Sequence, residues 1–183
     1  MNLTVGTEGC FLLKRQGDET FFRLVDSYWN DYIVKTDREF DKKVSMVKRS
    51  LKLLENPDAS LKSKDVADRL LTAYLLLNRF QAHAGPKAKT EPIDSAQSRL
   101  ILEAIEAGDW TQPFTGGDQL TARGVFIQLR LTPKDGWTAP QQGPMQDYRV
   151  FQKEWDAAAQ KWLKDNRAAY RIQRWVPEKA EKK

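Results

Sequence analysis

The chain contains one cysteine, Cys10, and one histidine, His83. These counts exclude a disulfide within the chain and a structural zinc site, which takes about four Cys or His ligands. A Ser-His-acid triad would have to use His83, and a Cys-His pair would have to use both residues. Nothing basic lies beside Cys10 in a strand-like run, so we interpret it as a buried apolar residue. His83 is interpreted as a solvated residue at a helix C-terminus, where positive charge is favoured.

Carboxylates are the remaining source of acid–base chemistry. Glycoside hydrolysis needs two of them at a set separation in space, which a sequence does not supply. Glu103 with Glu106, and Asp37 with Asp41, are interpreted as solvated helix faces. The turn at residues 116–118 (Gly-Gly-Asp) lacks the spacing of a phosphate-binding loop. A carboxylate-dependent hydrolase therefore stays an alternative, while no catalytic residue, metal site or cofactor is predicted.

One side of a predicted helix at 37–56 is basic. The net charge of the chain is +5 and its pI is near 9.3, which permits contact with nucleic acid or an acidic surface without requiring it. Such a side could contact phosphates with salt-dependent, largely nonspecific affinity, although Asp41 and Glu55 interrupt it. The candidate polyanion-binding residues are Arg38, Lys42, Lys48, Arg49 and Lys52.

Six tryptophans provide flat apolar faces on which a base or a sugar could stack. Trp155 and Trp162 lie at helical spacing with Phe151, which indicates core positions. Trp110 and Trp137 fall in predicted loops and are the candidates for an aromatic binding surface. Because Pro and Gly surround them, a lid over the core is the other interpretation.

The first secondary-structure element that the sequence predicts is a hairpin. Two strand-like runs, 10–15 and 20–25, flank the turn residues 16–19, and a third short run follows at 32–35. An isolated hairpin is marginal in water, so it needs a further strand or a helix to pack against. We expect the strand-like segment 170–177 to return to this hairpin and complete a small antiparallel sheet.

Helices are predicted for much of the rest. Thr36 and Glu39 have the spacing of a capping box before a helix that ends near 56. The segment 64–81, capped by Ser63, is apolar nearly all round, with Thr72 on a narrow polar edge, and belongs at the centre of a bundle. Further helices are expected from Pro92 to about 107, after Thr121, and over about 147–166.

The predicted fold class is therefore α+β, a mostly helical bundle around the central buried helix 64–81 with a small antiparallel sheet. The chain of 183 residues is long enough for one domain, which we place at 1–177, followed by a disordered tail at 178–183. No apolar run reaches the roughly 18 residues of a membrane span.

Four segments, in order along the chain, resemble an uncharacterised group of exported proteins from planctomycete-type bacteria. They are residues 3–13 (LTVGTEGCFLL), 60–73 (SLKSKDVADRLLTA), 89–94 (KTEPID) and 161–174 (KWLKDNRAAYRIQR). The resemblance implies the carboxy-terminal portion of a longer exported protein, located outside the cytoplasm or in the cell envelope. It implies no activity and no site residue. A complete chain with this amino terminus, which has no signal peptide, would instead be cytoplasmic.

These observations favour a non-enzymatic binding or scaffold domain of the bacterial cell envelope. Its partner is unknown, with another protein or an envelope polymer as the expected classes. The two alternatives are nucleic-acid or polyanion binding through the basic side of 37–56, and a carboxylate-dependent hydrolase.

Overall fold

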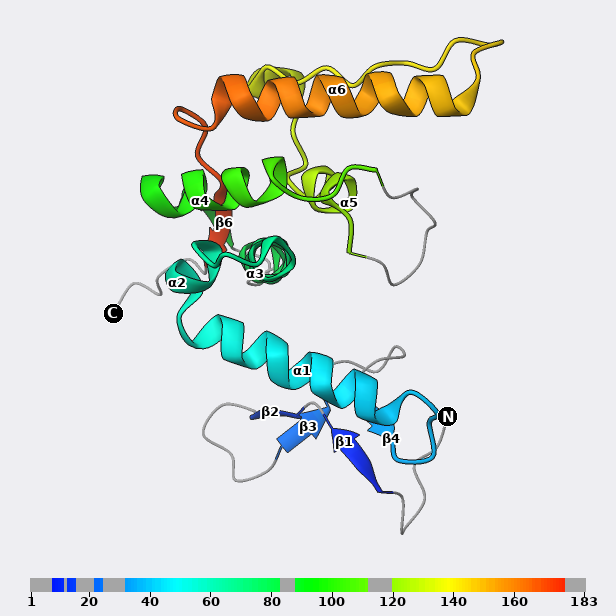
Figure 1. Cartoon of the computed structure of the whole chain (residues 1–183). Helices are drawn as coiled ribbons and strands as arrows, with labels where there is room; N and C mark the ends of the chain where they lie inside the picture. The colour runs from blue at the N-terminus through cyan, green and yellow to red at the C-terminus, as the bar shows by residue number, and fades with distance from the viewer. Residues whose placement is uncertain are drawn as a thin grey trace, which may run out of the picture. The chain divides into compact units, whose positions relative to one another are not determined.

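The computed structural model describes residues 8–11, 13–15, 22–24, 32–82, 88–111 and 120–176. Its contacts divide the chain into two compact units, Met1–Lys52 and Leu53–Lys183. The described residues form helices and short antiparallel strand pairs, so the predicted α+β class is confirmed (Figure 1). The single domain over 1–177 stays a prediction, and the tail 178–183 lies outside the described residues.

The first unit contains two antiparallel strand pairs. β1 (Gly9–Phe11) pairs with β4 (Tyr32–Val34), and β2 (Leu13–Arg15) pairs with β3 (Phe22–Leu24). The second pair agrees with the predicted hairpin. The close approach of the two strands requires glycine at position 9, because a Cβ atom there would lie 2.5 Å from the carbonyl oxygen of Ile33 on the partner strand.

Helix α1 (Phe40–Glu55) begins one residue after the predicted capping box. Asp37 takes the capping role, since its Oδ1 accepts the N–H of Glu39 at 2.8 Å and its carbonyl accepts the N–H of Phe40 at 2.9 Å. The hydrogen bond from Lys43, followed by that from the Glu39 N–H, lowers the pKa of the Asp37 carboxyl. An aspartate therefore stabilises this helix start, where the sequence predicted Thr36.

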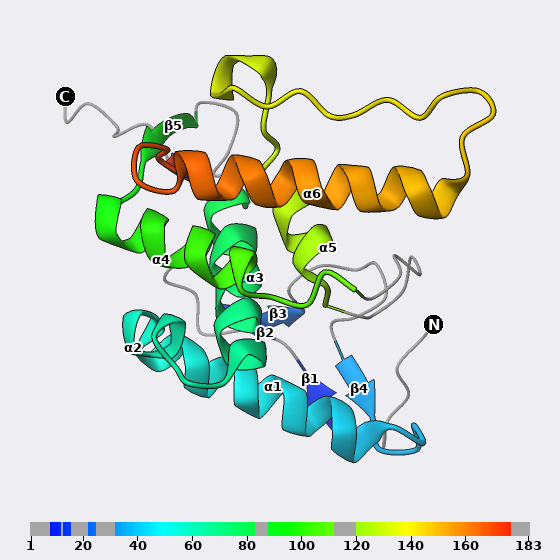
Figure 2. The same ribbon diagram turned by 45° about the horizontal axis from the view of Figure 1, so that its top comes forward.

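The second unit is built from α2 (Pro57–Leu61), α3 (Val66–Gln81), α4 (Ser95–Glu106), α5 (Ala122–Ile127) and α6 (Tyr148–Asn166). A short 3₁₀ turn, η1 (Pro133–Asp135), precedes the long connection to α6. Helix α4 packs against both α3 and α6 and lies between them in the view of Figure 1; Figure 2 shows the same helices turned by 45°. Leu77 of α3, Ile101 and Ile105 of α4 and Leu163 of α6 are fully buried there.

Helix α3 is the central helix that the sequence predicts, with two corrections. Its N-cap is Asp65, whose side chain accepts the N–H of Ala67 at 2.8 Å, and not Ser63. Thr72, placed on the polar edge by its type, is fully buried. Its hydroxyl donates to the carbonyl of Asp68 at 2.7 Å, so the helix itself satisfies the polar group and removes the cost of burying it.

The strand pair of the second unit differs from the prediction. β6 (Gln173–Val176) is formed as expected, but it pairs antiparallel with β5 (Lys89–Pro92) and not with the amino-terminal hairpin. The backbone supports this partner, because the N–H of Ile93 donates to the carbonyl of Ile172 at 2.9 Å. The N–H of Ile172 donates to Ser98 Oγ at 2.9 Å, which ties the strand pair to α4.

Pro92 explains why the chain is extended before α4. Proline has no N–H and disfavours helix at the residue before it, so Pro92 is the last residue of β5 and not, as predicted, part of a first helical turn. Helix α4 begins at Ser95, after Asp94, whose carboxylate accepts the N–H groups of Ala96 and Gln97. These backbone hydrogen bonds, the one from Gln97 first, lower the pKa of Asp94.

None of the helices in the described part of the chain is long and apolar enough to cross a membrane.

Candidate functional site

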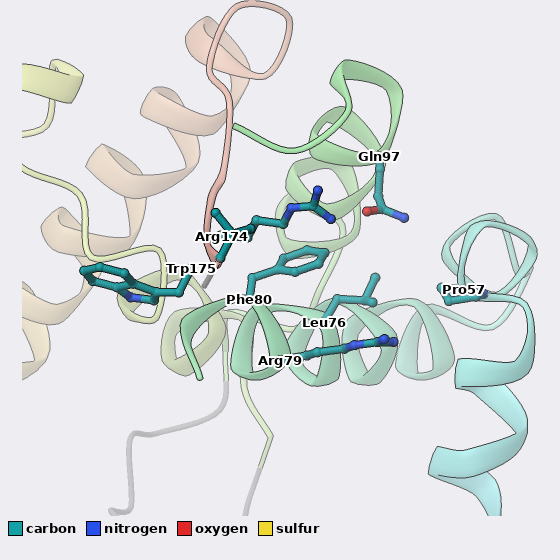
Figure 3. Close-up of a pocket in the computed structure, with 8 residues that line it drawn as sticks. Pro57, Leu76, Arg79, Phe80, Gln97, Arg174 and Trp175 are labelled. Carbon is teal, nitrogen blue, oxygen red and sulfur yellow. The ribbon is translucent and has the colours of Figure 1, made fainter. Parts of the chain in front are cut away.

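The second unit contains a cavity of about 350 Å³ beside α3 and β6, which we call the α3–β6 cavity (Figure 3). Its volume is at the lower end of the usual range for small-molecule sites. The lining combines apolar groups with two arginines and an amide: Pro57, Leu76, Phe80, Trp175 and Val176 with Arg79, Arg174 and Gln97. Leu76 and Phe80 come from α3 and Gln97 from the first turn of α4, while Pro57 is the first residue of α2.

Arg174 is held in position by its neighbour across the strand pair. Its Nε and Nη2 donate to Glu91 Oε1 at 3.0 and 2.5 Å, and the two residues are directly opposite in the register of β5 and β6. The guanidinium extends over Phe80 in Figure 3, whereas the Trp175 ring lies on the other side of the strand, as alternating side chains must. Nη1 of Arg174 keeps its hydrogen-bonding capacity for a further acceptor.

Arg79 is the second cation of the cavity. Its side chain is exposed, and within the described part of the chain no hydrogen bond or ion pair satisfies its guanidinium. Arg79 and Arg174 both extend toward the side of the cavity where Gln97 and Pro57 lie (Figure 3). The Gln97 Nε2 donates to Asp58 Oδ1 at 3.0 Å, so the start of α2 and the start of α4 are joined beside the cavity.

The lining of this cavity combines cationic, amide and apolar groups. The guanidinium groups and the Gln97 amide can donate hydrogen bonds, and the remaining lining residues offer apolar surface. Two guanidinium groups beside an apolar floor suit a ligand that joins an anionic group to an apolar body.

The structure places the five predicted polyanion-binding residues at the surface of the first unit. All are exposed: Arg38 in the turn before α1, and Lys42, Lys48, Arg49 and Lys52 on the helix. The spacing of 42 with 49, and of 48 with 52, puts each pair on the same side of a helix. Lys42 forms an ion pair with Glu39 at 3.0 Å, and the exposed Asp41 shares the basic side, so its positive charge is partly offset.

The two loop tryptophans are buried rather than open to solvent. Trp110 is 8% exposed, and its Nε1 donates to the carbonyls of Ile105 and Glu106 at 3.2 and 3.3 Å. Trp137 is 9% exposed, and its ring packs edge-on against Phe126. Both rings are therefore part of the buried core cluster, and the aromatic binding surface stays a prediction.

Three further residues considered from the sequence, Cys10, Glu103 and Glu106, lie beside identified protein neighbours. Cys10 is half-buried in β1, opposite Ile33. Glu103 pairs with Arg99 at 2.8 Å and Glu106 with Arg167 at 2.7 Å. His83 and the Gly-Gly-Asp turn at 116–118 lie outside the described residues. The residues that the structure describes include no group of three or more metal-binding side chains.

Sequence reasoning missed Arg79 and Arg174. Arg79 falls within the predicted helix 64–81, and Arg174 within the segment 170–177, which was expected to pair with the amino-terminal hairpin. Only the pairing of β6 with β5 brings these two positions to one cavity, and no local spacing encodes that contact.

No protein-family model, no curated protein and no solved structure matches this chain.

Proposed function

We propose that this chain is a non-enzymatic binding module whose ligand carries an anionic group on an apolar body and enters the α3–β6 cavity. The observation that carries the proposal is the exposed Arg79, a cation without a protein partner in the described part of the chain, beside Phe80 and the oriented Arg174. The resemblance to exported bacterial proteins supports a location in the cell envelope.

Phenyl phosphate is a suitable first probe, because it joins a dianionic group to one apolar ring. In ¹H–¹⁵N spectra of the full chain, we expect its titration to shift the amide signals of Phe80, Gln97 and Arg174. Phenol, the uncharged counterpart, should shift them much less. Arg79→Ala should weaken binding by about tenfold, since hydrogen bonds to charged groups contribute about 1.5–3 kcal/mol.

Arg149→Ala is the matched control, because Arg149 is also an exposed arginine on a helix but lies on α6, outside the cavity lining. Its affinity for phenyl phosphate should equal that of the unmodified chain. Equal affinities for all three proteins, or signal shifts confined to residues outside the cavity, would contradict the proposal.

Polyanion binding by the first unit is the second candidate, and the exposure of all five basic residues at 38–52 favours it. Reversing Lys48, Arg49 and Lys52 to Glu should then abolish retention on heparin, and the affinity of the unmodified chain should fall steeply with salt. The same change of charge at Lys153, Lys161 and Lys164 of α6 is the control. No retention at low salt, or equal loss in both triple variants, would remove this candidate.

A further inference from the structure

Three aromatic rings of the second unit meet at nearly right angles. Phe126 of α5 lies 5.0 Å from Trp137 with the ring planes at 74°, and 5.6 Å from Trp155 of α6 at 90°. Trp137 and Trp155 lie 5.6 Å apart at 81°. Each ring therefore presents an edge to another ring's face, the preferred geometry for aromatic pairs. The three side chains form a corner, which we call the aromatic corner.

A second cavity, of about 190 Å³, opens against the aromatic corner. Ile127, Leu131 and Arg130 complete its lining. An apolar cavity of roughly 150 Å³ is known to accept one benzene molecule, so this volume suits a single aromatic ring. Arg130 is the charged residue among the lining residues that the structure describes, which makes its position decisive for the kind of ligand.

Arg130 adopts a backbone conformation that arginine disfavours. Its φ is +51°, and it is the one non-glycine residue with positive φ among those described. Arg130 lies three residues after Ile127, the last residue of α5, and glycine adopts such a conformation without strain because it has no Cβ atom to crowd the backbone. Arginine at this position costs free energy that glycine would not.

The guanidinium of Arg130 is exposed, and the described part of the chain provides it with no hydrogen bond and no ion pair. A charged group at the edge of an aromatic cavity selects for the sign of the ligand. A cationic ligand, which aromatic rings otherwise attract, would be repelled by Arg130. A carboxylate would instead accept two parallel hydrogen bonds from the guanidinium.

We propose that this cavity binds a compact aromatic carboxylate, with the ring against the aromatic corner and the carboxylate on Arg130. The site is separate from the α3–β6 cavity, as the two share no lining residue. It is the second ligand site of the same unit.

Benzoate tests the proposal directly on the full chain. We expect it to bind with a shift of the indole N–H signals of Trp137 and Trp155, and to bind more tightly than benzyl alcohol, its uncharged counterpart. Arg130→Asn should weaken benzoate binding by about tenfold and leave benzyl alcohol unchanged, because only the charged contact is removed. Binding that survives Arg79→Ala would separate this site from the α3–β6 cavity.

The thermal midpoint distinguishes a ligand-binding role of Arg130 from a structural one. Asn and Gly tolerate positive φ, so Arg130→Asn and Arg130→Gly should keep or raise the midpoint while benzoate affinity falls. Lys134→Ala, an exposed basic residue of η1 outside the cavity lining, is the control and should change neither quantity. Unchanged benzoate affinity in Arg130→Asn, or no benzoate binding by the unmodified chain at millimolar concentration, would overturn the proposal.

Discussion

Two arginine–carboxylate pairs of the second unit have the same shortest distance and different surroundings. Arg123 Nη2 lies 2.5 Å from Asp156 Oδ2, and Arg174 Nη2 lies 2.5 Å from Glu91 Oε1. The side chains of the first pair are 8% and 13% exposed, whereas those of the second are 47% and 40% exposed. Water screens the second pair and hardly reaches the first. Burial, and not distance, therefore separates an arginine that stabilises the fold from one available to a ligand.

The buried pair is also the better connected of the two. Arg123 Nε donates to Asp156 Oδ1 at 2.7 Å, so the guanidinium binds both carboxylate oxygens, and Nη2 also reaches the carbonyl of Trp110 at 3.4 Å. These contacts join α5 to α6 and to the segment after α4. The exposed pair joins only two neighbouring strands, which leaves Arg174 at the edge of a cavity.

The largest expected effect is on the buried pair. Arg123→Ala leaves Asp156 charged and unpaired in the interior, and we expect it to lower the free energy of unfolding by about 3–5 kcal/mol. Urea titration followed by far-UV circular dichroism measures the change. The double variant Arg123→Met with Asp156→Leu removes both charges and should recover most of the loss. A loss under about 1 kcal/mol for Arg123→Ala would contradict the role assigned to burial.

An intermediate effect is expected for a group that becomes charged only at high pH. Burial, with Asp135 as a smaller contribution, raises the pKa of Tyr170 to about 12, and its ring packs at 5.1 Å against Trp162. The pKa of Tyr170 is higher in the folded state than its unfolded value near 10, so the folded state favours the neutral hydroxyl. The contribution of the neutral hydroxyl to the free energy of unfolding is complete below pH 10 and is lost as the pH rises to about 12.

Tyr170→Phe removes that ionisation. Between pH 10 and 12 the stability of the unmodified chain should fall more steeply than that of the variant, by less than about 1.4 kcal/mol per pH unit, because solvent reaches part of the ring. Thermal unfolding at half-unit steps of pH measures both slopes. Parallel curves for the two proteins would show that burial does not control this titration.

The smallest effect on stability is expected for the exposed pair. Arg174→Ala should change the free energy of unfolding by at most about 1 kcal/mol, and even that difference should shrink at 1 M salt. The same variant should lose affinity for phenyl phosphate, because Arg174 lines the α3–β6 cavity. A stability loss as large as that of Arg123→Ala would remove the contrast between the two pairs.

The sequence predicts the elements better than it predicts their contacts. Apolar spacing locates α3 and α6 to within a few residues, and Thr121 caps α5 as expected, its hydroxyl accepting the N–H of Gly124 at 3.1 Å. These features depend on neighbours within one or two helical turns, so residue type and spacing contain the information. The start of α4 was misplaced because Pro92 suits both a first helical turn and an extended strand.

The sites depend on contacts between distant segments, and the sequence does not encode these locally. The lining of the α3–β6 cavity requires that β6 pair with β5, a pairing between four-residue segments with no apolar alternation to fix it. Burial of Trp137 depends on Phe126 and Trp155 from two other elements. Loop position left two interpretations of Trp137, an aromatic binding surface or a lid over the core, and the large apolar area of its ring favours the burial that the structure shows.

The most direct measurement compares the affinity of phenyl phosphate for the unmodified chain, Arg79→Ala and Arg149→Ala by calorimetric titration at low salt, with urea unfolding of the same three proteins. We expect Arg79→Ala alone to lose about tenfold in affinity, with all three unfolding free energies within about 0.5 kcal/mol. Equal affinity in all three proteins would contradict the assignment of Arg79 to a ligand. If Arg79→Ala lost unfolding free energy as well as affinity, the role of Arg79 would be to stabilise the fold and not to bind a ligand.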